Sequence, residues 1–199
     1  MSVPTEPDVR SQRPRRLAKP ITVKRLENVA AAYVARYDAS SARLRTVLMR
    51  RIDKARTHDM PVVDNAEAVI DSILARYTKA GVIDDARYAE RKAGSLHRRG
   101  TSSRHIREKL KLAGIDRDDV ERALDVARDE LAVDATGMDL QAALAFARRR
   151  RLGPFRAPAD RAERRNRDLA ALGRAGFSFD IARRVIDTDD PDALGRDGP

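Results

Sequence analysis

The chain of 199 residues contains no cysteine and no tryptophan, and aromatic residues make up only 4% of it. The lack of cysteine excludes disulfide scaffolds, thiolate metal sites and cysteine nucleophiles. The three histidines, His58, His97 and His105, show none of the paired spacings of a metal-ligand cluster. The scarcity of aromatic residues argues against single-strand binding through stacked bases. We therefore expect neither a metal nor a cofactor in this protein.

Long apolar runs and catalytic motifs are missing as well. No apolar stretch approaches the roughly 20 residues that span a bilayer, and no apolar segment follows the N-terminal arginines. We therefore expect a cytoplasmic protein without a membrane partner. The chain has no Gly-rich phosphate loop and no GxGxxG, HExxH or GxSxG motif. The chain therefore lacks the residues that nucleotide hydrolysis, dinucleotide chemistry and common hydrolase mechanisms need, so we predict that the protein is not an enzyme.

Hydrophobic residues make up 42% of the chain, enough to bury a core, and they recur three and four positions apart without strand-like alternation. This pattern predicts an all-α fold. The expected helices span residues 22–37, 40–54, 65–80, 85–98, 102–113, 117–132, 138–151, 158–174 and 179–188. Residues 1–20 are rich in proline and arginine and predict a disordered basic arm, and residues 188–199 predict a disordered tail.

Helix starts and stops are visible in the sequence. Side chains that can accept a hydrogen bond from first-turn amides precede the expected helices at Ser40, Asp64, Asp84, Ser102, Asp116 and Ser178. At the other ends, Gly81, Gly114 and Gly176 each follow an alanine and precede an apolar residue. That pattern predicts a left-handed C-terminal cap with its hydrophobic contact.

A repeat of 62 residues relates the helices. It places Leu48 over Leu110 and then over Leu172, and it places the Ser40–Ser41 pair over Ser102–Ser103. Because such a period marks stacked helical units, it predicts three tandem three-helix repeats in an elongated, curved, solenoid-like arrangement. The predicted units are residues 21–80, 81–132 and 133–187, with insertions at residues 56–64 and 151–158.

Charge is segregated along the chain, which carries 41 Lys+Arg against 31 Asp+Glu, a net charge of +10. Residues 91–111 and residues 148–167 each carry a local charge of +7, while residues 116–134 between them carry −5. The four consecutive arginines Arg148 to Arg151 repel each other unless they meet phosphates or carboxylates. We predict one basic face that binds a polyanion, made of Arg98, Arg99, Arg104, Arg107, Lys109, Lys111, Arg148, Arg149, Arg150, Arg151, Arg164, Arg165, Arg183 and Arg184.

Residues 102–129 also resemble a helix-turn-helix, with Gly114 at the turn. The second helix of such a module enters the major groove, but here it carries Asp118, Asp119, Glu121 and Asp125. These carboxylates would face phosphates at high electrostatic cost. The sequence therefore favours phosphate contacts that depend steeply on salt over the reading of a base sequence.

Four motifs stand out along the chain. They are the Leu-x-x-x-Leu pattern that ends in a glycine joint, the segment 81–89 (GVIDDARYA), Arg98-Arg99-Gly100 followed by Ile106-Arg107-x-x-Leu110, and the closing GFSFD of residues 176–180. Together these motifs resemble the RecX family of bacterial recombinase regulators. The resemblance covers about residues 29–187 and is most specific between residues 81 and 124. Members usually carry Phe where this chain has Tyr88, and the first unit matches least well because its joint lacks the glycine.

The resemblance implies a non-enzymatic regulator made of three tandem three-helix units. Members of the family bind the RecA recombinase, lie along the groove of its filament on DNA, and restrain ATP hydrolysis and strand exchange, and some bind DNA directly. We therefore expect a RecA-type filament and the DNA backbone as partners of a monomer that acts in recombination, repair and the SOS response. Two alternatives remain: a helix-turn-helix-like DNA-binding protein without a recombinase partner, and an adaptor that binds another acidic protein.

Overall fold

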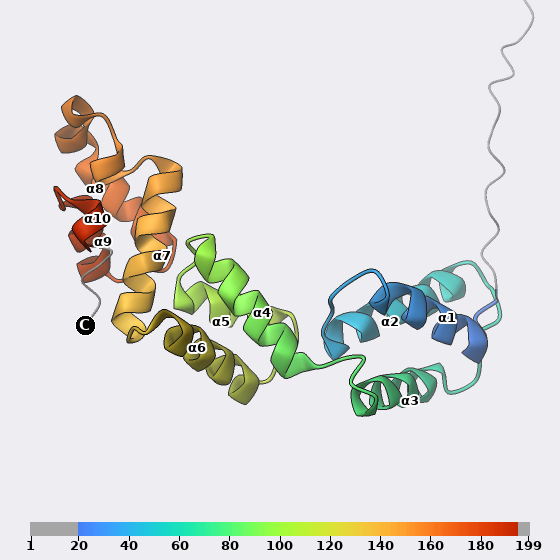
Figure 1. Ribbon diagram of the computed structural model, residues 1–199. Helices are drawn as coiled ribbons and strands as arrows, with labels where there is room; N and C mark the ends of the chain where they lie inside the picture. The colour runs from blue at the N-terminus through green and yellow to red at the C-terminus, as the bar shows by residue number, and fades with distance from the viewer. Residues whose placement is uncertain (1–19, 195–199) are drawn as a thin grey trace, which may run out of the picture.

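The computed structural model describes residues 20–194 and is all-α in that range, as predicted (Figure 1). The chain from residue 1 to 19 lies outside the described residues, and so does almost all of the predicted basic arm. The helices are α1 (Val23–Val34), α2 (Ser41–Thr57), α3 (Ala66–Lys79), α4 (Asp85–Arg98), α5 (Ser103–Leu112), α6 (Arg117–Leu131), α7 (Ala135–Arg150), the 3-10 turn η1 (Gly153–Phe155), α8 (Pro158–Arg174), α9 (Phe179–Ile186) and α10 (Pro191–Leu194).

Most of the predicted helix caps are present. The side chain accepts a hydrogen bond from a first-turn amide at Ser40, Asp84, Ser102, Asp116 and Ser178. The prediction that Asp64 is a cap is wrong, because α3 begins at Ala66 and its N-cap residue is Asn65. Asn65 adopts a left-handed conformation with φ +51°, which asparagine tolerates better than most residues, and its side chain makes no capping bond.

The predicted glycine stops are confirmed. Gly81, Gly114 and Gly176 have φ values of +66°, +78° and +84°, a region that side chains with a Cβ rarely adopt. Gly176 is also in a crowded position, since a Cβ there would lie 2.6 Å from the Oγ of Ser102. Glycine at this position therefore lets two consecutive groups of helices approach each other closely.

Three helix boundaries differ from the prediction by three residues, and two short elements were not expected. Helix α1 ends at Val34, whereas its predicted end was residue 37. Helix α2 continues to Thr57, and α7 begins at Ala135 because Asp134 caps it. The inserted residues after α7 form η1. The tail was expected to be disordered, but α10 forms in it, because Asp190 accepts hydrogen bonds from the amides of two following residues and Leu194 packs against the core.

Buried apolar side chains form three clusters along the chain. The first comes from α1–α3 and the residues around them, the second mainly from α4–α6, and the third from α7–α9 and their neighbours. Leu48, Leu110 and Leu172, which the 62-residue period relates, are each 0% exposed. The prediction that these three leucines occupy buried positions is therefore confirmed. The division into three units at the predicted boundaries stays a prediction.

The joint between α1–α3 and α4–α6 is made by the two serines at the start of α2. Ser40 donates its hydroxyl to the carbonyl oxygen of Ala113 at 2.6 Å, at the end of α5. The backbone amide of Ser41 donates to Asp85 Oδ1 at 2.8 Å, in the first turn of α4, and its hydroxyl donates to the other carboxylate oxygen. Arg91 of α4 also pairs with Asp38, which precedes α2.

The same bonds recur at the joint between α4–α6 and α7–α9. Ser102 donates its hydroxyl to the carbonyl oxygen of Ala175 at 2.8 Å, at the end of α8. The amide and the hydroxyl of Ser103 donate to the two carboxylate oxygens of Asp139 on α7 at 2.7 and 2.9 Å. The first serine pair lies 62 residues before the second, so the sequence period reflects a repeated joint as well as repeated cores.

The joints place the helix groups one after another. In Figure 1, α1–α3 and α7–α10 lie at opposite ends with α4–α6 between them, and the chain turns where α7 begins. This elongated outline is compatible with the expected curved solenoid. Within the described residues, none of the helices has the length and apolar character needed to cross a membrane.

A basic groove at the second joint

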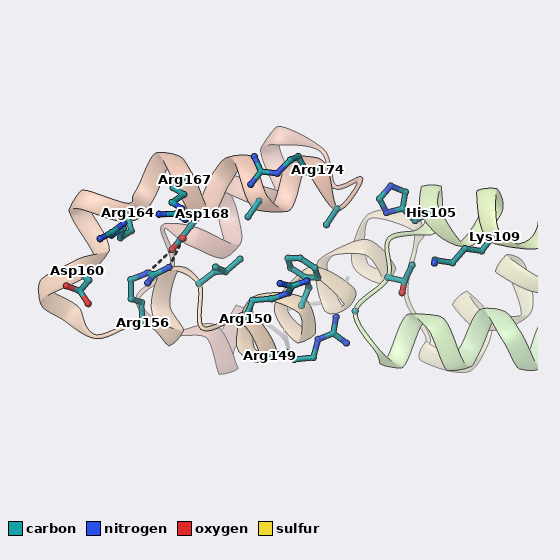
Figure 2. Close-up of a pocket in the computed structure, with 16 residues that line it drawn as sticks. His105, Lys109, Arg149, Arg150, Arg156, Asp160, Arg164, Arg167, Asp168 and Arg174 are labelled. Carbon is teal, nitrogen blue, oxygen red and sulfur yellow. Dashed lines mark hydrogen bonds and ion pairs between the residues drawn. The ribbon is translucent and has the colours of Figure 1, made fainter. Parts of the chain in front are cut away.

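A groove of about 750 Å³ lies at the second joint, between α5 on one side and α7 and α8 on the other. Figure 2 shows its polar side chains spread along the groove on these three helices, with Arg156 on the loop before α8. The lining includes seven Lys and Arg side chains, His105, and two acids, Asp160 and Asp168. The basic residues are Lys109, Arg149, Arg150, Arg156, Arg164, Arg167 and Arg174.

One wall of the groove is a stripe along α8. Asp160, Arg164, Arg167, Ala171 and Arg174 line it, and their spacing of three and four residues puts them on one face of a helix. Helix α8 has 17 residues, whereas its repeat counterpart α5 has 10. Because the two helices end at positions that the period relates, the extra turns of α8 lie at its N-terminal end, next to the insertion.

The insertion after α7 is held to α8 by a buried carboxylate. Asp168 is 1% exposed, and it accepts hydrogen bonds from the Gly153 amide at 2.9 Å and from Arg156 Nε and Nη2 at 3.1 and 2.8 Å. This hydrogen bond raises the pKa of the Arg156 guanidinium above its ordinary value. Arg161 adds bonds to the carbonyl oxygens of Pro154 and Arg156. The loop therefore packs as a fixed part of the groove wall.

The facing wall carries arginines held against an aromatic ring. The guanidinium carbons of Arg149 and Arg150 lie 5.9 and 5.6 Å from the centre of the Phe146 ring, within the range of a cation–π contact. The backbone also approaches closely here. A Cβ on Gly100, in the turn before α5, would lie 2.6 Å from the amide nitrogen of Phe146. The turn that carries Thr101 into the groove is thus packed directly on α7.

The structure places some of the predicted binding residues in this groove and the others outside it. Lys109, Arg149, Arg150 and Arg164 line it together, so side chains of the two +7 segments do meet. The remaining members of the predicted face do not line the groove, namely Arg98, Arg99, Arg104, Arg107, Lys111, Arg148, Arg151, Arg165, Arg183 and Arg184. That either set binds a partner stays a prediction.

Several of the arginines outside the groove have acidic partners within the chain. Arg104 lies 3.3 Å from Glu108, Arg148 lies 2.7 Å from Asp192, and Arg165 pairs bidentately with Asp187. Arg107 pairs with Glu121, and this hydrogen bond raises the pKa of the arginine and lowers that of the glutamate. These pairs are solvent-exposed, and they give arginines of the predicted binding face acidic partners within the chain itself.

Among the basic side chains of the groove, sequence reasoning missed His105, Arg156, Arg167 and Arg174, and it also missed the two acids Asp160 and Asp168. The spacing of Arg164, Arg167 and Arg174 within one expected helix was a usable signal, because residues three and seven apart share a face. Arg156 had no such signal, since it lies in the insertion and its position depends on Asp168. Among the described residues, no group of three or more His, Asp or Glu side chains could hold a metal ion.

Comparison with known proteins identifies the family. The model of the family "RecX, second three-helix domain" matches residues 84–124, which run from the N-cap of α4 into α6. Regulatory protein RecX of Myxococcus xanthus is 38% identical over 183 residues, which cover 92% of this chain and 95% of that protein. The chain belongs to the RecX family. This membership confirms the resemblance found in the sequence.

Two further RecX proteins are similar over shorter regions. Regulatory protein RecX of Agrobacterium fabrum is 35% identical over 104 residues, which cover 52% of this chain and 51% of that protein. Regulatory protein RecX of Thermobifida fusca is 29% identical over 152 residues, which cover 73% and 77%. No solved structure matches this chain. The three similar proteins are all named as regulatory proteins.

Proposed function

We propose that this RecX-family chain is a non-enzymatic regulator of a RecA-type recombinase, binding the recombinase and its filament on DNA and lowering ATP turnover and strand exchange. The observation that carries the proposal is the near full-length similarity to a protein named Regulatory protein RecX. The basic groove supports it physically, because a DNA filament offers phosphates and surface carboxylates to a cationic surface.

The groove suggests how the contact would form. It joins cations from α5 with cations from α7 and α8, so a partner that enters it touches two consecutive helix groups at once. The Ser102 and Ser103 bonds fix these groups relative to each other, so little conformational entropy would be lost on binding. Asp118 and Asp129 of α6 are exposed, and they can pair with basic elements of the filament.

The proposal is tested by measuring recombinase ATP turnover on single-stranded DNA with increasing amounts of this protein. We expect turnover to fall at saturation, and we expect no hydrolysis by this protein alone. The Arg149→Ala/Arg150→Ala variant should weaken the inhibition. The matched control is Arg50→Ala/Arg51→Ala, which removes the same charge from α2, outside both the groove and the predicted face. Unaltered turnover at saturating protein, or intrinsic ATPase activity, would refute the proposal.

The helix-turn-helix alternative predicts a different result. In that case α6 would have to approach DNA, although Asp118, Asp125 and Asp129 are exposed on it. A competition between recombinase-coated and naked DNA at equal salt separates the two functions. A strong preference for the coated DNA supports regulation of the filament, and equal binding supports the alternative.

A further inference from the structure

The groove at the second joint holds more positive charge than its own acids neutralise. Asp168 is already paired with Arg156, which leaves Asp160 as the other acid of the lining. Within the described part of the chain, no ion pair is formed by Lys109, Arg149, Arg150, Arg167 or Arg174. Among the described residues, Arg164 pairs only with the neighbouring Glu163, at 3.5 Å. Cations brought this close repel one another, so the groove is electrostatically suited to a compact anion.

The cations stand on opposite walls. Figure 2 shows Arg164, Arg167 and Arg174 along one wall, Arg149 and Arg150 along the facing wall, and Lys109 towards one end. A single phosphate group in contact with one wall would leave the cations of the other wall without a partner. A chain of linked phosphates can contact both walls, because each phosphate unit presents its own oxygens.

The size and rigidity of the groove fit a small ligand. Its volume of about 750 Å³ lies inside the range of roughly 300–1,000 Å³ that is usual for small-molecule sites. Its walls are fixed before a ligand arrives, by the Ser102 bond to Ala175 and by the Arg156 bonds to Asp168. The ring of Phe146 holds two of the arginines in place. Such preorganisation raises affinity because less freedom is lost on binding.

We propose that this groove is a binding site for a linear oligophosphate, such as the triphosphate chain of a nucleotide. The phosphates are the recognised group, and the arginines of α7 and α8 bind them from both sides. Arginine suits this role because its planar guanidinium donates paired hydrogen bonds to phosphate oxygens. The proposal requires no recombinase and no hydrolysis, so it stands separately from the proposed function.

Calorimetric titration of the full chain at about 0.15 M ionic strength tests the proposal. The probes are inorganic phosphate, inorganic triphosphate, AMP, ADP and ATP. We expect one saturable site whose affinity rises with each added phosphate, and we expect inorganic triphosphate to displace ATP. Failure of triphosphate to bind, or failure to displace ATP, would overturn the proposal, because the phosphates would then not be the recognised group.

Variants test the location of the site. Arg149→Ala/Arg150→Ala and Arg164→Ala/Arg167→Ala should each weaken triphosphate binding at least about tenfold. The control Arg50→Ala/Arg51→Ala, which removes the same charge from α2 outside both the groove and the predicted face, should leave it within about twofold, and thermal melts identify folded variants. Equal weakening by the control would overturn the proposal, since overall charge would then explain the binding.

A short single-stranded oligonucleotide serves as the last probe and separates the two sources of phosphates. Displacement of the oligonucleotide by triphosphate supports a shared groove. Binding of the oligonucleotide with no binding of triphosphate overturns the oligophosphate site and leaves the regulation of a DNA filament intact.

Discussion

The serine at each joint has two roles, and their energies can be separated by mutation. Ser102 is fully buried; it caps α5 by accepting from the His105 amide, and it donates across the joint to the carbonyl oxygen of Ala175. Removing a serine cap costs about 1 kcal/mol. Leaving the half-buried carbonyl without its partner adds about 1 kcal/mol, the lower end of the range for unsatisfied groups. Ser102→Ala should therefore lower the free energy of unfolding by about 2 kcal/mol.

Ser178 serves as a control that separates the energy of the joint hydrogen bond from the energy of the helix cap. Ser178 caps α9 in the same way, but it is exposed and makes no bond across a joint in the described structure. Ser178→Ala should cost about 1 kcal/mol, half of the Ser102 effect, in urea unfolding followed by circular dichroism. Ser40→Ala should match Ser102→Ala, because Ser40 makes the equivalent bond to Ala113. The reasoning is refuted if Ser102→Ala costs no more than Ser178→Ala.

Two further changes test the core and an ion pair. Leu110→Ala should lower the free energy of unfolding by about 2–5 kcal/mol because Leu110 is 0% exposed, while Leu112→Ala, at 88% exposure, should stay within about 0.5 kcal/mol; equal losses in urea unfolding would contradict the assignment. The hydrogen bond from Arg107 lowers the pKa of Glu121 below its ordinary value of 4.5. The pair therefore stabilises the folded chain fully above pH 4.5, and this stabilisation is lost as the pH falls through the lowered pKa. Arg107→Ala should flatten this acid-side loss of stability, and an unchanged pH profile would exclude a contribution of the pair.

The helices were predictable because local signals agreed with the packing. Apolar residues at helical spacing gave each expected helix, and the glycine stops gave the ends of α5 and α8. The period of 62 residues also placed Leu48 and Leu110 correctly in buried positions. Short elements were missed where one tertiary contact decides the structure. Helix α10 forms because Asp190 caps it and Leu194 finds an apolar surface, and no periodicity in the tail indicates either contact.

The groove was only partly predictable, because charge along the sequence does not show which side chains face each other. The run Arg148 to Arg151 reads as one cluster, yet Arg148 pairs with Asp192 while Arg149 and Arg150 line the groove. Consecutive helical residues point about 100° apart, so four of them cannot share one face. Counting charges therefore located the segment, and only the fold could choose the residues.

Asp168 offers a last test of how the insertion builds the groove wall. The period places Asp168 where Leu44 and Ile106 stand, and both of those are 0% exposed. A carboxylate at such a position is stable only because Arg156 and the Gly153 amide bind it. Arg156→Ala alone should therefore destabilise the chain more than Arg156→Ala combined with Asp168→Ile, which restores the apolar residue of the second unit. The midpoints of urea unfolding of the single and the double variant test this expectation. A midpoint for Arg156→Ala at or above that of the double variant would show that the buried carboxylate does not need its arginine.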